Sequence, residues 1–181
     1  KGPFKSWHHT HNFEVTSDGK VLIHDKVNYK LPMGFLGKLV AGRMIKKRLT
    51  RMFTAREIRL ERDLKRHAEF SHLKRKKILV AGSSGLIGRQ LVAFLDTGGH
   101  DVWRLVRREP KSGEKEIRWN PTEEIIHPEQ IEGFDTVIHL GGAGIGDKRW
   151  SKKRMKLIEE SRVGSTTFLA KTISNLENKP E

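Results

Sequence analysis

The feature that most constrains the fold of this chain is a run of three glycines at residues 82, 85 and 88, within A-G-S-S-G-L-I-G-R-Q. The apolar stretch 77–81 precedes the run and an amphipathic stretch follows it, so it joins a predicted strand to a predicted helix. Such a turn gathers backbone N–H groups at a helix N-terminus, where they bind the phosphates of a nucleotide. A glycine-rich turn with a purely structural role has the same pattern.

Each glycine has an expected function in this turn. Gly82 allows a tight turn out of the strand, Gly85 lets backbone N–H groups approach a pyrophosphate, and Gly88 lets the helix pack close to the sheet. The candidate cofactor contacts in the turn are Gly82, Ser83, Ser84, Gly85, Leu86, Ile87 and Gly88.

Strands and helices are predicted to alternate after residue 77. Strands are expected at 77–81, 101–107, 117–119 and 135–140, and helices at 86–95 and 151–175. Alternation with short loops is typical of an α/β fold, here the N-terminal half of a doubly wound parallel Rossmann sheet.

The end of the second predicted strand bears on the choice of cofactor. An acidic residue there holds the ribose 2′-hydroxyl of NAD, whereas arginine suits the 2′-phosphate of NADP. This strand ends in Val106, Arg107 and Arg108, which favours NADP. Glu109 follows directly and leaves NAD open, and an ordinary charged strand end has the same residues.

The first part of the chain has a different pattern. Alternating apolar residues over 4–16 and 21–31, with S-D-G-K between them, predict a β-hairpin, and 35–68 predicts one long amphipathic helix. The basic segment 69–76 is the expected linker. Two strands and a helix bury little on their own, so we expect further structure upstream of Lys1.

The net charge of +14 is concentrated between residues 30 and 77, where lysine and arginine outnumber acidic residues several-fold. Such a run attracts RNA, anionic lipid or an acidic partner. Few aromatic residues are interleaved with the charges to stack on bases, so we interpret the run as a solvated helix face and a basic linker. Nucleic-acid binding is not expected.

Cysteine is absent from the sequence, which excludes disulfides and thiolate metal sites and is typical of a reducing, cytoplasmic environment. The chain also has no run of about 18 apolar residues, so no membrane span is expected.

Several further motifs accompany the glycine turn: L-V-R-R at 105–108, R-W-N-P at 118–121, V-I-H-L-G-G-A-G-I at 137–145, K-R-W at 148–150 and E-S-R-V at 160–163. With them, residues 77–181 resemble the extended short-chain dehydrogenase/reductase superfamily. The branch that they resemble is the nucleoside-diphosphate-sugar epimerase-like one, often mislabelled as cell-division inhibitors.

The resemblance implies that Leu140, Gly141 and Gly142 contact the cofactor through their backbone and that Arg162 reaches a cofactor phosphate. An exposed helix arginine is the alternative for Arg162. The chain departs from the branch at Gly141, where alanine is usual, and at Ser165, where glycine is common.

Residues 1–68 resemble the C-terminal half of a START-like domain, the polyketide-cyclase and lipid-transport fold, through G-P-F-K-S-W-H-H-T-H-N-F, D-K-V-N-Y-K-L-P and the long helix. His9 and His11 share one face of the first strand, and with His24 they form a conceivable zinc site. We interpret them instead as a polar patch beside the cavity of this domain and expect no metal.

The superfamily uses a tyrosine and a lysine four residues apart as acid and base. The one tyrosine of this sequence, Tyr29, is followed directly by Lys30, so no catalytic residue is assigned. We therefore expect a fragment that carries the cofactor half of an NADP-dependent epimerase or reductase acting on a small substrate such as a nucleotide-sugar. The alternative is a non-catalytic NADP-binding redox sensor whose START-like part carries a hydrophobic ligand.

Overall fold

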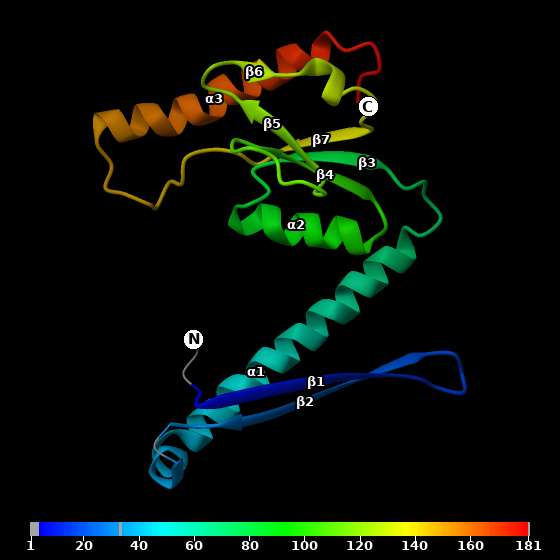
Figure 1. Cartoon of the computed structure of the whole chain (residues 1–181), viewed down its shortest axis with the longest axis vertical. Coiled ribbons are helices and arrows are strands. Elements are labelled where there is room, and N and C mark those ends of the chain that lie inside the picture. The colour runs from blue at the N-terminus through cyan, green and yellow to red at the C-terminus, as the bar shows by residue number, and fades with distance from the viewer. Residues whose placement is uncertain (1–3, 33, 181) are drawn as a thin grey trace. The chain divides into compact units, whose positions relative to one another are not determined.

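The computed structural model describes residues 4–32 and 34–180. The chain forms two compact units, Lys1–Leu64 and Lys65–Glu181, here called the first and the second unit (Figure 1). Their boundary falls inside the long helix α1, Gly34–Glu69. The end of that helix belongs to the second unit because the ring of His67 stacks on Phe94, with 4.4 Å between ring centroids.

The first unit contains an antiparallel hairpin and most of α1. Strand β1, Ser6–Val15, pairs along its whole length with β2, Val21–Lys30. Gly19 has a φ of 79° in the connecting turn, a conformation that favours glycine. The hairpin and the long helix lie where the alternation and the helical spacing of the sequence predict them.

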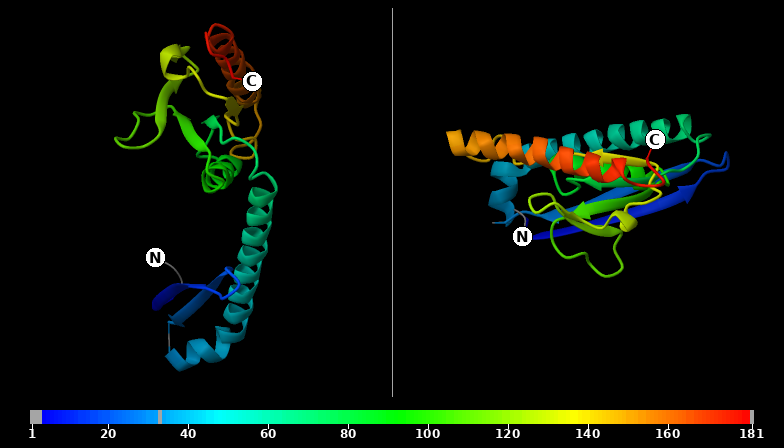
Figure 2. Two further views of the ribbon diagram at one scale, coloured as in Figure 1. Left: turned by 90° about the vertical axis from the view of Figure 1, so that its right-hand side faces the viewer. Right: turned by 90° about the horizontal axis from the view of Figure 1, so that it is seen from above.

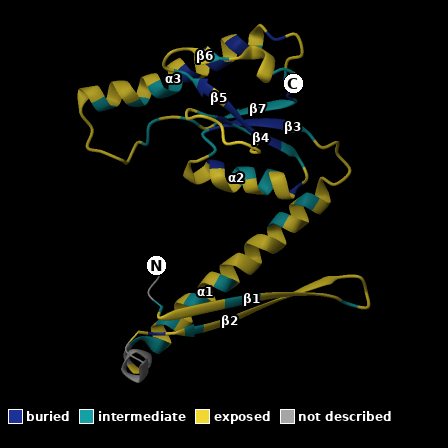
Figure 3. Cartoon of the chain, viewed as in Figure 1, coloured by how far each residue is buried: buried dark blue, intermediate teal, exposed yellow. Residues whose placement is uncertain are grey.

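Little of the first unit is buried. Leu31 is the one buried residue among those described in this unit, and large apolar side chains of the hairpin are exposed, among them Phe13, Val15 and Val21 (Figure 3). Neither strand therefore has a covered apolar face of the kind that stabilises an isolated sheet.

The second unit is an α/β structure built on a five-stranded sheet. Its strands are β3 (Lys77–Ala81), β4 (Asp101–Val106), β5 (Glu116–Asn120), β6 (Ile125–Ile126) and β7 (Thr136–His139), in the spatial order β6-β5-β4-β3-β7. The four longer strands are parallel, and β6 is antiparallel to β5. The expectation of an all-parallel sheet is wrong at this edge, because a tight turn through Glu124, with a φ of 53°, reverses the chain after β5.

Helices α2, Leu86–Thr97, and α3, Lys152–Ser174, cover opposite faces of the sheet (Figures 1 and 2). Alternate strand residues therefore enter two cores. Leu79, Leu105 and Trp119 pack with Phe168 of α3, whereas Ile78, Val80 and Val102 pack with Val92 and Leu95 of α2. A short 3-10 helix, η1 (Pro128–Gln130), precedes β7.

None of the described helices combines the length and the apolar character needed to cross a lipid bilayer. The longest of them, α1, carries charged residues throughout its length.

Candidate functional site

The glycine turn connects β3 to α2 at the carboxyl edge of the sheet. Gly82 has a φ of 78°, and a Cβ atom at this position would lie 2.6 Å from the backbone N of Gly141 and 2.7 Å from the carbonyl O of Leu140. The backbone after β3 thus runs directly against the backbone after β7. Only glycine fits here, both for its conformation and for the close approach.

The turn closes tightly on the start of α2. The N–H of Gly85 donates to the carbonyl of Gly82 at 3.1 Å, and a Cβ atom on the buried Gly88 would lie 2.2 Å from that same carbonyl oxygen. Helix α2 therefore packs close against the turn. Gly85, its N-cap residue, offers no side-chain cap, and the first turn has no acidic residue. Its first N–H groups, which a helix leaves without internal acceptors, are available to an anion.

The other predicted contacts of the turn lie open. Leu86 and Ile87 are 81% and 68% exposed, unusually high values for large apolar residues. Ser84 is exposed and Ser83 half-buried, and within the described part of the chain neither hydroxyl has a hydrogen-bond partner. The turn therefore presents unsatisfied polar groups and uncovered apolar surface side by side.

The loop after β7 is held by a chain of hydrogen bonds that begins on His139. The N–H of Gly141 donates to His139 Nδ1 at 3.1 Å, and His139 Nε2 lies 2.8 Å from Ser165 Oγ of α3. The Ser165 hydroxyl donates to the carbonyl of Ser161 at 2.7 Å. Because Nδ1 accepts a hydrogen bond, the proton of the neutral ring is on Nε2, which donates to Ser165. Burial lowers the pKa of His139 and favours this neutral form.

The histidine also explains the departure at Gly141. A Cβ atom on Gly141 would lie 2.6 Å from Cε1 of the His139 ring, so alanine does not fit while the ring occupies this position. Ser165, the second departure, is buried and is the residue that accepts from His139. The two unusual residues are thus parts of one arrangement around His139.

Arg162 lies against the same loop. Its Nη1 donates to the carbonyl of Ala143 at 3.1 Å, and the N–H of Ala143 donates to Ser161 Oγ at 2.9 Å. A Cβ atom on Gly142 would lie 3.0 Å from Cζ of Arg162. The structure therefore brings Arg162 together with Gly142, where it fastens the loop to α3.

The two arginines after β4 differ in their contacts. Arg108 makes a two-pronged ion pair with Glu116, with Nη1 and Nη2 at 2.8 Å and 2.6 Å from the carboxylate oxygens. The Glu116 side chain is 3% exposed and also accepts from the N–H of Lys111. These hydrogen bonds, first that from Arg108, lower the pKa of Glu116 to about 2. Arg107 is exposed, and no described side chain pairs with its guanidinium.

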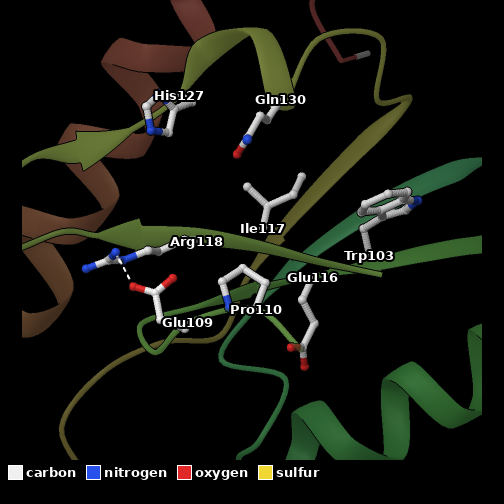
Figure 4. A pocket seen from close by; sticks show the side chains of 8 residues that line it. All are labelled: Trp103, Glu109, Pro110, Glu116, Ile117, Arg118, His127 and Gln130. Atoms are coloured by element: carbon white, nitrogen blue, oxygen red, sulfur yellow. Dashed lines mark hydrogen bonds and ion pairs between the residues drawn. The ribbon is translucent and has the colours of Figure 1, made fainter. Parts of the chain in front are cut away.

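Glu109, the acidic residue that keeps NAD as an alternative cofactor, forms an ion pair with Arg118 of β5. Both line a hollow of about 500 Å³ together with Trp103, Pro110, Glu116, Ile117, His127 and Gln130 (Figure 4). None of these residues belongs to the glycine turn or to the loop after β7. The hollow therefore adjoins the candidate cofactor site only at its β4 end, where Glu116 pairs with Arg108.

The candidate site thus gathers the ends of three adjacent parallel strands: the turn after β3, the arginines after β4 and the loop after β7. Open α/β sheets bind ligands at this edge. Sequence reasoning missed His139, Ser161 and Glu116 as positioning residues. For His139 the available signal was a histidine within an otherwise apolar run, V-I-H-L. Glu116 begins a strand of mixed composition, E-I-R-W-N, and offered no comparable signal.

Residues 78–179 match the model of the family described as NAD dependent epimerase/dehydratase, which is more than half of the chain. The chain belongs to this family. The match begins in β3 and runs beyond α3, so it covers the glycine turn, both arginines and the loop after β7.

Curated relatives match the same region. An epimerase family protein of Mycobacterium bovis is 37% identical over 98 residues, 54% of this chain and 32% of that protein. The human epimerase family protein SDR39U1 is 31% identical over 107 residues, 58% of this chain and 34% of its own length. The chain thus spans about a third of the length of these relatives.

One solved structure is similar over both units. It is a nucleoside-diphosphate sugar epimerase from Corynebacterium glutamicum, 36% identical, with a TM-score of 0.68. The similarity covers 96% of this chain and 33% of the Corynebacterium chain. The hairpin and α1 therefore have a counterpart in a relative that also contains the α/β unit.

Proposed function

We propose that the second unit binds a nicotinamide dinucleotide, NADP in preference to NAD, across the carboxyl ends of β3, β4 and β7. The observation that carries this proposal is the cradle at Gly82 and Gly88, where any Cβ atom would strike backbone. The uncapped N-terminus of α2 opens directly from that cradle. Such an end favours an anion through its free N–H groups and its dipole.

The residues present fit the cofactor in three places. The backbone of 82–88, with the hydroxyls of Ser83 and Ser84, holds the pyrophosphate. The backbone of Leu140, Gly141 and Gly142 borders the cofactor where the chain leaves β7. Arg162 keeps that border in place and adds a positive charge beside it.

The two arginines divide their tasks. Arg107 is exposed at the end of β4 and binds the 2′-phosphate of NADP. Arg108 is committed to Glu116 and holds the loop that presents Arg107. Glu109 is paired with Arg118, which reduces its availability to a ribose 2′-hydroxyl and favours NADP.

The family and the Corynebacterium relative support a reaction for the whole protein. When bound, the nicotinamide would supply reversible hydride transfer, which both the epimerisation and the reduction of a sugar use. We infer a nucleotide-sugar or a similar small molecule as substrate, after the name of that relative. This chain binds and orients the cofactor, and the acid/base pair of the reaction is not assigned to its residues.

The test is a titration of the chain with NADPH and with NADH, followed by tryptophan and nicotinamide fluorescence. We expect NADPH to bind at least tenfold more tightly than NADH, equivalent to about 1.4 kcal/mol. Arg107→Ala removes this preference by weakening NADPH alone, and Lys111→Ala, on the same loop, serves as the charge-matched control. Equal affinities for the two cofactors in the wild-type chain would contradict the NADP assignment, and binding of neither would contradict the site.

For the first unit we propose a START-like domain of which the hairpin and α1 are a part. The exposed apolar side chains of Phe13, Val15 and Val21 support it, because they need a cover that this unit does not supply. The second candidate function is that of a sensor. In it, the START-like domain binds a hydrophobic ligand and the second unit senses the cofactor. The test measures the affinity for a fluorescent fatty acid. We expect the wild-type chain to bind it and the Phe13→Ser variant to bind it less tightly.

A further inference from the structure

Three potential metal ligands converge on one face of the hairpin in the first unit. His9 and His11 are two residues apart on β1, and Asp25 on β2 lies directly opposite His11 in the strand register. Alternation along a strand places all three on the same face. One ligand atom of each lies within 4.8 Å of those of the other two.

The distance between His9 and Asp25 suits a shared ion. His9 Nε2 lies 3.2 Å from Asp25 Oδ1, and His11 Nδ1 contacts the same oxygen. Two ligands about 2.0–2.1 Å from a tetrahedral zinc ion are separated by roughly 3.3 Å. The rings of His9 and His11 are 4.0 Å apart between centroids, so both nitrogens face the carboxylate from neighbouring positions.

The surroundings restrain two of the three side chains, His9 and Asp25. Those of His9 and Asp25 are 19% and 22% exposed, and the ring of Phe53 packs edge-on against His9 at 5.5 Å. Arg56 of α1 binds the other carboxylate oxygen, Oδ2, at 3.2 Å and leaves Oδ1 to the histidines. Hydrogen-bonded outer partners of this kind orient ligating carboxylates in metal sites.

We propose that His9, His11 and Asp25 bind a zinc ion, with Arg56 orienting the carboxylate and a fourth position left to water. Two imidazoles and one carboxylate with an open position form the ligand set of many zinc sites. The third ligand is Asp25 and not His24, the third ligand that the sequence suggested. His24 lies at an even position of β2 and faces Glu14, with Nε2 3.8 Å from Oε2.

The competing explanation is a metal-free ion-pair cluster in which Asp25 is shared by Arg56 and the two imidazoles. The two explanations differ in one measurable respect. A zinc site stabilises the fold by an amount that grows with the logarithm of the free zinc concentration, whereas the stability of an ion-pair cluster does not depend on zinc.

The experiment titrates the chelator-treated chain with Zn²⁺ by calorimetry and with Co²⁺ by visible absorption. We expect one site per chain, Co²⁺ absorption bands typical of a four-coordinate ion, and a melting temperature that rises with Zn²⁺. Asp25→Asn and His11→Gln each weaken binding at least tenfold, and the matched control His24→Gln, on the opposite face, leaves it unchanged. Circular dichroism verifies that each variant is folded.

Three results would overturn the proposal. They are no saturable binding by the wild-type chain, unchanged affinity in folded Asp25→Asn, or an equal loss in His24→Gln. If both ligand variants unfold, Arg56→Lys, which keeps the ligands, still decides: the wild-type chain must bind one Zn²⁺ and Arg56→Lys must bind it less tightly. None of these outcomes depends on the cofactor, because Arg107→Ala is expected to bind Zn²⁺ like the wild type.

Discussion

The imidazole of His139 at the end of β7 and the hydroxyl of Ser165 in α3 lie 2.8 Å apart, and this contact joins the loop of the candidate site to the helix behind it. His139 also accepts from the N–H of Gly141. One side chain therefore fixes both where the loop leaves the sheet and how α3 sits on it.

Ser165→Ala is expected to destabilise the second unit by about 1–2 kcal/mol, because it leaves the Nε2–H of a half-buried histidine without its acceptor. The matched control is Ser174→Ala in the same helix, where an exposed hydroxyl donates only to the carbonyl of Lys171. Urea unfolding followed by circular dichroism measures both. Equal effects of the two substitutions would show that the His139 contact contributes nothing.

The stability of the second unit is expected to fall as the pH drops below about 6.5, the ordinary value for histidine. Burial lowers the pKa of His139 in the folded chain, so between the folded value and 6.5 the unfolded chain binds more protons. The contribution is complete above pH 6.5 and is lost progressively below it. Melting temperatures between pH 7.5 and 5.5 should decline more steeply for the wild type than for His139→Gln, and parallel curves would contradict this account.

The lowered pKa of Glu116 predicts that stability also changes in a second, more acidic pH range. Its pKa is lowered to about 2 by the hydrogen bonds from Arg108 and from the N–H of Lys111. Its stabilising contribution is therefore present above about pH 4.5, the ordinary value, and is lost as the pH falls through 2. The difference in melting temperature between the wild type and Glu116→Gln should shrink from pH 5 towards pH 2.

Arg108→Ala should lower the melting temperature more than Arg107→Ala, because only Arg108 neutralises the buried Glu116 carboxylate. The cofactor titration should give the opposite order, with the larger loss of NADPH affinity relative to NADH in Arg107→Ala. If the same substitution caused the larger loss both of melting temperature and of NADPH affinity, the proposed division of tasks would be wrong.

Gly82→Ala should cost more than the 1–2 kcal/mol or so of a left-handed conformation, because the added Cβ also strikes the backbone of Leu140 and Gly141. Gly113→Ala is the matched control, since Gly113 has the same φ of 78° and nothing within 4 Å of its Cβ position. The difference between the two unfolding free energies isolates the clash. Equal losses of unfolding free energy in the two variants would mean that the loop after β7 shifts to accommodate the added Cβ atom.

Most elements of the fold could be predicted from the sequence because they depend on neighbouring residues. The turn at 82–88, the long helix and the longer strands follow from local spacing of glycine and apolar residues. Strand β6 could not be predicted, since it has two residues and owes its direction to a turn through Glu124. The domain limits expected at residues 68 and 76 stay predictions.

The sequence by itself determined the glycine turn, the alternation of strands and helices and the position of the arginines after β4. Only the tertiary structure decided which of those arginines is committed to Glu116, that His139 and Ser165 meet across 26 positions, and that Asp25 joins His9 and His11. The physical reason is the distance along the sequence over which the deciding interactions act. Backbone conformation is set by adjacent residues, whereas the partner of a polar side chain depends on strand register and helix packing, which bring distant residues within hydrogen-bonding distance.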